Sequence, residues 1–130
     1  MTMTFMPHSM RLIVRTKQLL ATDNRGARIV ARCQVDGKIV RRIFPYRYDV
    51  PHGGDNFPFA ALSLLHDDIM PKFNLGVRSY YSDFDREGGV LIAVLSRNAP
   101  KHLTAAQLLE LEGVDLMEDA NNFFSQETMQ

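Results

Sequence analysis

Residues from Ala27 to Val35 alternate between a mostly polar set and an apolar set, which is the period of a β-strand with one buried face. Asp36-Gly37 follows, a dipeptide typical of two-residue hairpin turns, and Lys38–Phe44 can return as the paired strand. The preceding stretch Arg11–Thr22 is rich in long and β-branched apolar residues and lacks Gly and Pro. The first part of the chain therefore predicts three consecutive strands.

A helical pattern begins after the Gly- and Pro-containing segment that ends at residue 54. Asp55 or Asn56 can cap this helix, and Pro58 lies in its first turn, where a missing N–H is least costly. Apolar residues continue at helical spacing until Pro71, which predicts the end of the helix.

Strand and helix patterns follow once more after this helix. Tyr80–Asp85 and Val90–Leu95 flank a Gly-Gly turn and predict a second hairpin. Thr104, with Gln107 three residues later, forms a capping box for another helix, which Gly113 is placed to end. The order β-β-β-α-β-β-α predicts an α+β fold in which a mainly antiparallel sheet carries one or two helices.

Length and composition favour a single small domain. The chain has 130 residues, 45% of them hydrophobic and 23% charged, which is enough to bury a core without cross-links. We expect a loose N-terminal extension at residues 1–10, one α+β domain at residues 11–115 and an acidic C-terminal tail at residues 116–130. The single Cys33 cannot form an internal disulfide, and no apolar run approaches the ~20 residues of a membrane span. The expected location is therefore the cytoplasm, without membrane association.

The two halves of the chain carry opposite charge, although the formal net charge is zero. Residues 1–50 contain ten Lys and Arg against three Asp, whereas residues 51–130 contain five Lys and Arg against twelve Asp and Glu. Such asymmetry indicates either an anionic partner for the basic half or contact between the two halves.

The predicted turn determines which residues face each other across the first hairpin. With Asp36-Gly37 as a two-residue turn, Arg32 lies directly opposite Arg41, an unfavourable like-charge pair. A sheet face that mixes arginines with apolar side chains suits a phosphate backbone, and Arg also stacks on bases. We therefore expect nucleic acid or another phosphate-bearing ligand to bind through the basic side chains of the first three strands: Arg15, Lys17, Arg28, Arg32 and Arg41.

Two other interpretations of the charge pattern stay open. Exposed arginines are often only solvated, with their stems covering apolar atoms, and the acidic half could lie over them within one molecule. Alternatively, the acidic C-terminal half could bind a host protein, so that the chain would be an inhibitor or adaptor, for example against an antiviral defence system. The sequence contains no RNP-type aromatic box, zinc knuckle or helix-turn-helix pattern that would decide between these interpretations.

Catalytic and metal-binding patterns are weak. His8, His52, His66 and His102 are scattered without HxH, HExxH or Cys–His spacing, and Cys33 falls on the apolar face of its strand. No nucleophile, base and orienting group belong together in the sequence. We therefore expect neither a cofactor nor a metal, and we favour a binding protein over an enzyme.

The segment Ala21–Ala31, with Thr16-Lys17 before it and Pro45–Asp49 after it, resembles a group of small uncharacterised proteins encoded by phages and plasmids. In that group a T-K/R strand leads into a TN-x-G-x-RI-x-A turn and strand, followed by an aromatic segment and a helix. The resemblance covers the N-terminal half of the chain and carries no known activity. It implies a mobile-element accessory protein, a class whose small members commonly bind nucleic acid or block a host protein.

Overall fold

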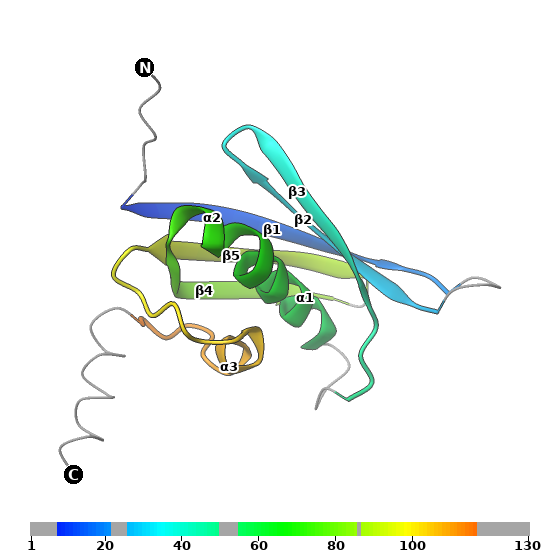
Figure 1. The fold of residues 1–130 in the computed structure, drawn as a ribbon. Coiled ribbons are helices and arrows are strands. Elements are labelled where there is room, and N and C mark those ends of the chain that lie inside the picture. Colours follow the sequence, from blue (N-terminus) through cyan, green and yellow to red (C-terminus); the bar gives the residue numbers. More distant parts are fainter. Residues whose placement is uncertain (1–7, 22–25, 50–54, 86, 117–130) are drawn as a thin grey trace, which may run out of the picture.

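The computed structural model describes residues 8–21, 26–49, 55–85 and 87–116 and confirms the predicted α+β fold. Its strands form an antiparallel five-stranded sheet in the order β3-β2-β1-β5-β4, with a helical layer on one face (Figure 1). The strands are β1 (Ser9–Leu19), β2 (Arg28–Val35), β3 (Lys38–Pro45), β4 (Gly76–Phe84) and β5 (Gly88–Ser96). The helical elements are α1 (Asn56–Leu64), the π-helical segment η2 (Leu65–Ile69), α2 (Met70–Phe73) and α3 (Ala105–Leu109). Within the described residues, no helix combines the length and the apolar character of a membrane span.

Strands β2 and β3 form the hairpin that the sequence predicts. Both turn residues have positive φ, 54° at Asp36 and 79° at Gly37, as a type I′ turn requires. Asp tolerates this conformation, and Gly adopts it without steric cost. Val35 consequently pairs with Lys38, and the register confirms that Arg32 lies opposite Arg41.

Strand β1 occupies the centre of the sheet, between β2 and β5. It starts at Ser9, two residues before the predicted start of the domain, because Ser9 and Met10 pair with the end of β5. At the other end, Leu116 is buried and its N–H donates to the carbonyl of Arg78 in β4. Leu116 therefore packs with the domain, and the rest of the predicted acidic tail lies outside the described residues.

Helix α1 begins at Asn56, but its capping differs from the prediction. Asp55 occupies the N-cap position, and its side chain makes no capping hydrogen bond. The Asn56 side chain instead accepts from the Arg47 N–H at 2.7 Å and donates to the Arg47 carbonyl at 2.9 Å. This exchange holds the segment after β3 against the start of the helix.

The predicted end of the helical segment at Pro71 is wrong by two residues. The π-helical turn η2 precedes α2, so that Pro71 lies in the first turn of a new helical element, where its missing N–H is tolerated. The helix then continues to Phe73, and Asn74, with a φ of 53°, terminates it.

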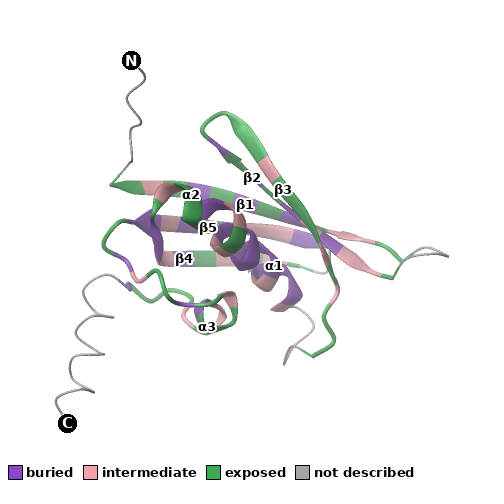
Figure 2. Ribbon diagram, viewed as in Figure 1, coloured by how far each residue is buried: buried purple, intermediate pink, exposed green. Residues whose placement is uncertain are grey.

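The core lies between the sheet and the helical layer (Figure 2). Helix α1 contacts all five strands, and nearly all of its residues are buried. From β2, the alternating residues Ile29, Ala31, Cys33 and Val35 are buried in this core, as the strand pattern predicts. The opposite face of the sheet is therefore left free of the helices.

Helix α3 packs at the β4 edge of the molecule and has the predicted capping box. The Thr104 hydroxyl accepts from the Gln107 N–H at 3.2 Å, and the Gln107 side chain accepts from the Thr104 N–H at 2.8 Å. The helix ends at Leu109, before the predicted Gly113, and Gly113 then donates its N–H to the carbonyl of Tyr80. The segment after α3 is thereby attached to β4.

Candidate nucleic-acid interface

The face of the sheet that points away from the helices carries a row of arginines. Arg15 of β1 pairs with Arg32 of β2, which in turn pairs with Arg41 of β3. All three residues are exposed, and neighbouring strands lie about 4.8 Å apart. Arg15, Arg32 and Arg41 therefore lie side by side across three adjacent strands, and we call them the arginine row.

No acidic residue in the described part of the chain forms an ion pair with the arginine row. The ion pairs of other arginines lie elsewhere: Arg42 with Asp67 and Asp68, Arg47 with Asp49, and Arg78 with Asp115. Like charges that face each other directly in a sheet are destabilising by roughly 0.2–1 kcal/mol per pair. The row therefore concentrates positive charge that no ion pair among the described residues compensates.

The remaining two predicted residues adjoin one side of this row. Lys17 is exposed and pairs with Val30 of β2, so that it lies two residues from Arg15 on the same face. Arg28 pairs with Leu19, is half-buried, and has its Nε buried without a hydrogen-bond partner among the described residues. The structure thus brings all five predicted residues to one face, and Arg28 is the least accessible of them.

An exposed apolar row begins beside Arg15 on β1 and extends away from the arginine row, over β5 and β4. Ile13 of β1 pairs with Ile92 of β5, which pairs with Tyr81 of β4. Their exposed fractions are 44%, 45% and 63%, and Ile39 of β3, on the same face, is 67% exposed. We call Ile13, Ile92 and Tyr81 the apolar row. Sequence reasoning missed it because the row depends on the pairing of β1 with β5, which are far apart in the chain.

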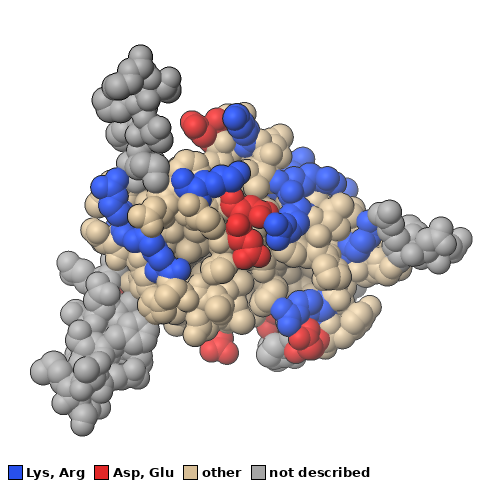
Figure 3. Space-filling model, in the orientation of Figure 1, with Lys and Arg blue, Asp and Glu red and all other residues tan. Residues whose placement is uncertain are grey.

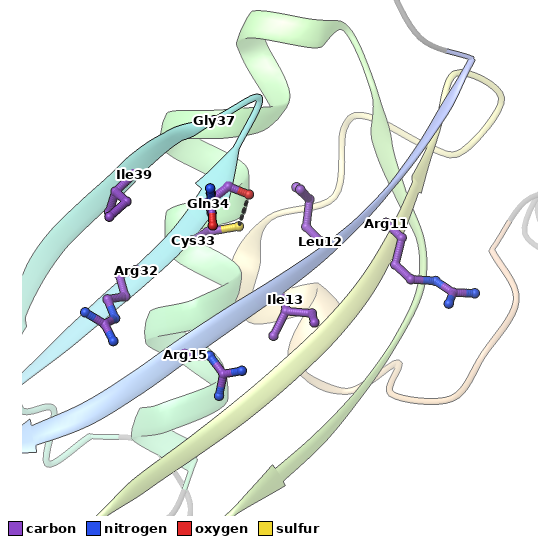
Figure 4. A pocket seen from close by; sticks show the side chains of 9 residues that line it. All are labelled: Arg11, Leu12, Ile13, Arg15, Arg32, Cys33, Gln34, Gly37 and Ile39. Carbon is purple, nitrogen blue, oxygen red and sulfur yellow. Dashed lines mark hydrogen bonds between the residues drawn. The ribbon is translucent and has the colours of Figure 1, made fainter.

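A groove opens between β1 and β2 beside the arginine row (Figure 4). The β1–β2 ladder ends at the pair Val14–Cys33, whereas β1 continues to pair with β5 and β2 continues to pair with β3. Beyond this point, strand twist separates the β1–β5 pair of strands from the β2–β3 pair, which leaves a groove of about 550 Å³. We call it the fork groove. Its lining contains no Asp or Glu and includes Arg11, Arg15, Arg32, Ile13, Ile39 and Cys33.

Cys33 lies at the bottom of the fork groove and is only 2% exposed, which confirms the prediction of a buried thiol. Burial raises the pKa of this thiol from 9.0 to about 11, against a smaller lowering effect of a hydrogen bond with the Ile13 backbone. A thiol with so high a pKa is a poor nucleophile near neutral pH. Cys33 is therefore an unreactive core residue beneath the groove.

The charge is mixed on the Lys17 side of the arginine row. A second hollow there combines Lys17 and Arg41 with Asp85 and Glu87. The Asp85 carboxylate already accepts hydrogen bonds from the N–H groups of Glu87 at 2.8 Å and Gly88 at 3.2 Å. An anion is consequently better accommodated at the fork groove than at this turn.

The helical side of the molecule differs, because basic and acidic side chains are interspersed over it (Figure 3). Arg42, the neighbour of Arg41 on β3, lies 2.7 Å from Asp68 and 3.6 Å from Asp67. His66 lies 2.7 Å from the Asp67 carboxylate. These contacts join η2 to the edge strand β3 and give His66, Asp67 and Asp68 a structural role.

Candidate catalytic and metal-binding side chains do not come together in the described residues. Among them, no group of three or more His, Cys, Asp or Glu could hold a metal ion. His8 precedes β1, His66 lies on η2 and His102 precedes α3, while His52 lies outside the described ranges. The open sheet face is therefore the strongest candidate for a functional site in the described part of the chain.

Comparison with protein-family models, curated proteins and solved structures found no match for this chain. The resemblance to phage and plasmid proteins stays a prediction, and the function has to be argued from the geometry and charge of the sheet face.

Proposed function

We propose that this protein binds nucleic acid through the open face of its sheet and is not an enzyme. The observation that carries the proposal is the arginine row, in which Arg15, Arg32 and Arg41 are cross-strand neighbours without ion-pair partners among the described residues. Such a row lowers the stability of the fold, because opposed like charges repel. A polyanion relieves the repulsion when its phosphates accept hydrogen bonds from the guanidinium groups.

The size of the basic surface favours a chain of phosphates over one small anion. The arginine row spans two strand spacings, about 10 Å, and Lys17 and Arg28 adjoin it. Several phosphates of one polymer can therefore contact several cations at once. The resemblance to mobile-element accessory proteins supports the same class of partner.

Equilibrium titration of labelled oligonucleotides at two salt concentrations tests this proposal. Phosphate binding releases condensed counterions, so affinity should fall steeply as salt rises. Joint replacement of Arg32 and Arg41 by Gln should weaken binding and flatten the slope of log affinity against log salt by about 1.4, since each phosphate contact on a single strand contributes about 0.7.

Lys72→Gln provides a matched control, because it removes an exposed cation from α2 in the helical layer. This variant should keep both the affinity and the salt dependence of the unmodified protein. Failure of the unmodified protein to bind any oligonucleotide at low salt would contradict the proposal and favour a protein partner instead.

A further inference from the structure

The apolar row gives the sheet face a second property besides its charge. Ile13 lies two residues along β1 from Arg15, a displacement of about 6.6 Å. Ile92 and Tyr81 continue the apolar row over β5 and β4, two residues from Val90 and Asp83, which continue the line of the arginine row. The residues of the apolar row are substantially exposed, and no described helix covers this face. A row of exposed cations that meets a row of exposed apolar side chains at β1 suits a ligand that carries anionic groups and apolar groups next to each other.

We propose that this face binds single-stranded in preference to double-stranded nucleic acid, with phosphates on the arginine row and bases over the apolar row and the fork groove. This inference rests on the proposed function. In a duplex the bases are paired and stacked, and they offer only their edges in the grooves to a protein. In a single strand the faces of the bases are free to stack on aromatic rings and to cover aliphatic side chains.

Tyr81 is the aromatic platform of this arrangement. It is exposed on β4 beside Ile92, its partner on β5, and its ring lies next to Gly113, at which an added Cβ would be 3.5 Å from the Tyr81 Cε1. A glycine at this position leaves the ring edge uncovered. Because every base has a π-face, stacking on such a ring tolerates any sequence, and we expect little base preference.

Charge argues against a second copy of the chain as the occupant of this face. A second copy would bring three more arginines to the interface, and the acid on the line of the arginine row, Asp83 of β4, supplies one carboxylate for three cations. No acidic side chain lines the fork groove. A partner that matches both rows must carry negative charge and planar apolar groups. Single-stranded nucleic acid carries both.

Three ligands of equal length test this inference: oligothymidylate, the same backbone without bases, and an oligothymidylate–oligoadenylate duplex. A length of about 12 nucleotides lies within the site sizes of single-strand binding folds. The baseless backbone keeps the phosphates of oligothymidylate and removes only the stacking partners. We expect oligothymidylate to bind at least about fivefold more tightly than either of the other ligands.

Variants of Tyr81 assign this preference to the apolar row. Tyr81→Ala should remove most of the preference and leave the salt slope unchanged, whereas Tyr81→Phe should retain the preference because it keeps the ring. Tyr48→Ala is the matched control, since Tyr48 is also exposed but lies after β3, where it packs against Tyr46. A thermal melt of each variant establishes that its fold is intact.

The outcomes separate this inference from the proposed function. Equal affinity for the baseless backbone, or tighter binding of the duplex, overturns the inference while nucleic-acid binding stands. A preference for oligothymidylate that survives Tyr81→Ala overturns the placement of bases on the apolar row. Absence of binding to all three ligands overturns the proposed function as well.

Discussion

Arg32 and Arg41 face each other across the β2–β3 ladder, and neither forms an ion pair with a described residue. The type I′ turn at Asp36-Gly37 sets this opposition, because it fixes the register of the whole hairpin. Strand β1 then adds Arg15 beside Arg32, which extends the repulsion to a third strand. The fold tolerates the row because its members are exposed and water screens their charges.

The Arg32→Gln and Arg41→Gln double variant should therefore fold at least as stably as the unmodified protein. Loss of the opposed charges should leave the free energy of unfolding unchanged or raise it by up to about 1 kcal/mol. Urea denaturation at low and high salt measures this, and the difference should shrink at high salt. A clear loss of stability would instead indicate that acidic groups hold these arginines, as expected if the acidic half lies over them.

The Arg32–Arg41 pair was predictable because a two-residue turn determines its hairpin register locally. The buried side of β2 was also predictable from local sequence, because the alternation of polar and apolar residues around Cys33 assigns the two faces of the strand. The adjacency of Ile13 to Ile92 was not, because β1 and β5 meet only when the core assembles over the helical layer. Sequence reasoning therefore identified the cations of the candidate site and missed its apolar row.

The helical layer shows the same limit. The start at Asn56 follows from local residues, but the π-helical turn before Pro71 does not, since it accompanies contacts with a distant strand. In that turn Asp67 and Asp68 both meet Arg42 of β3. Pairings of this kind depend on tertiary structure and leave no periodic signal in the chain.

The Arg42–Asp68 contact should contribute modestly to stability. Asp68 is the less exposed partner, with 19% of its side chain accessible against 46% for Arg42, so the interaction is partly shielded from water. A double-mutant cycle with Arg42→Gln and Asp68→Asn should give a coupling free energy of up to about 1 kcal/mol, decreasing with salt. A coupling indistinguishable from zero at low salt would mean that this ion pair does not stabilise the attachment of β3 to η2.

Gly88 should be intolerant of any side chain, because it lies where β5 passes close to β1. Its φ is 149°, and an added Cβ would lie 2.1 Å from the carbonyl oxygen of Thr16. Gly88→Ala should lower the free energy of unfolding by about 2–4 kcal/mol, measured by urea denaturation. Gly26→Ala is the control, since no atom of the described residues lies within 4 Å of its added Cβ, and it should change stability by less than about 0.5 kcal/mol. Similar effects of both substitutions would contradict the close approach of β5 to β1.

The hydroxyl of Tyr80 should stabilise the attachment of α3 to β4. Its oxygen lies 2.6 Å from the carbonyl oxygen of Leu108 and 3.0 Å from that of Leu109, in buried surroundings at the end of the helix. Tyr80→Phe removes the donor and leaves these carbonyls without it, which should cost about 1–2 kcal/mol of unfolding free energy. Tyr81→Phe, at the exposed neighbouring position, should cost less than about 0.5 kcal/mol. Equal values for the two variants would show that the Tyr80 hydroxyl adds nothing to this packing.

Cys33 should make stability depend on alkaline pH. Its pKa is raised by burial from 9.0 to about 11, so the folded state holds this proton more tightly than the unfolded chain does. The corresponding stabilisation is fully present below about pH 9 and is lost as pH rises through about 11. Replacement by Ala should therefore reduce the decline of stability over this range in urea denaturation curves recorded at successive pH values.

The same burial should make the Cys33 thiol slow to react in the native protein, although it lies at the bottom of the fork groove. Only the thiolate attacks thiol reagents, and a pKa of about 11 leaves roughly 1 thiol in 1000 ionised at pH 8. Labelling with a chromogenic disulfide should be slow under native conditions and fast in urea, where the thiol regains its ordinary pKa and is fully accessible.

Bound oligothymidylate over the fork groove should slow the native reaction further, whereas the baseless backbone should slow it less. Rapid labelling of the native protein would show that the reagent reaches the thiol through the fork groove. Cys33 would then be more accessible in solution than its exposed fraction of 2% implies.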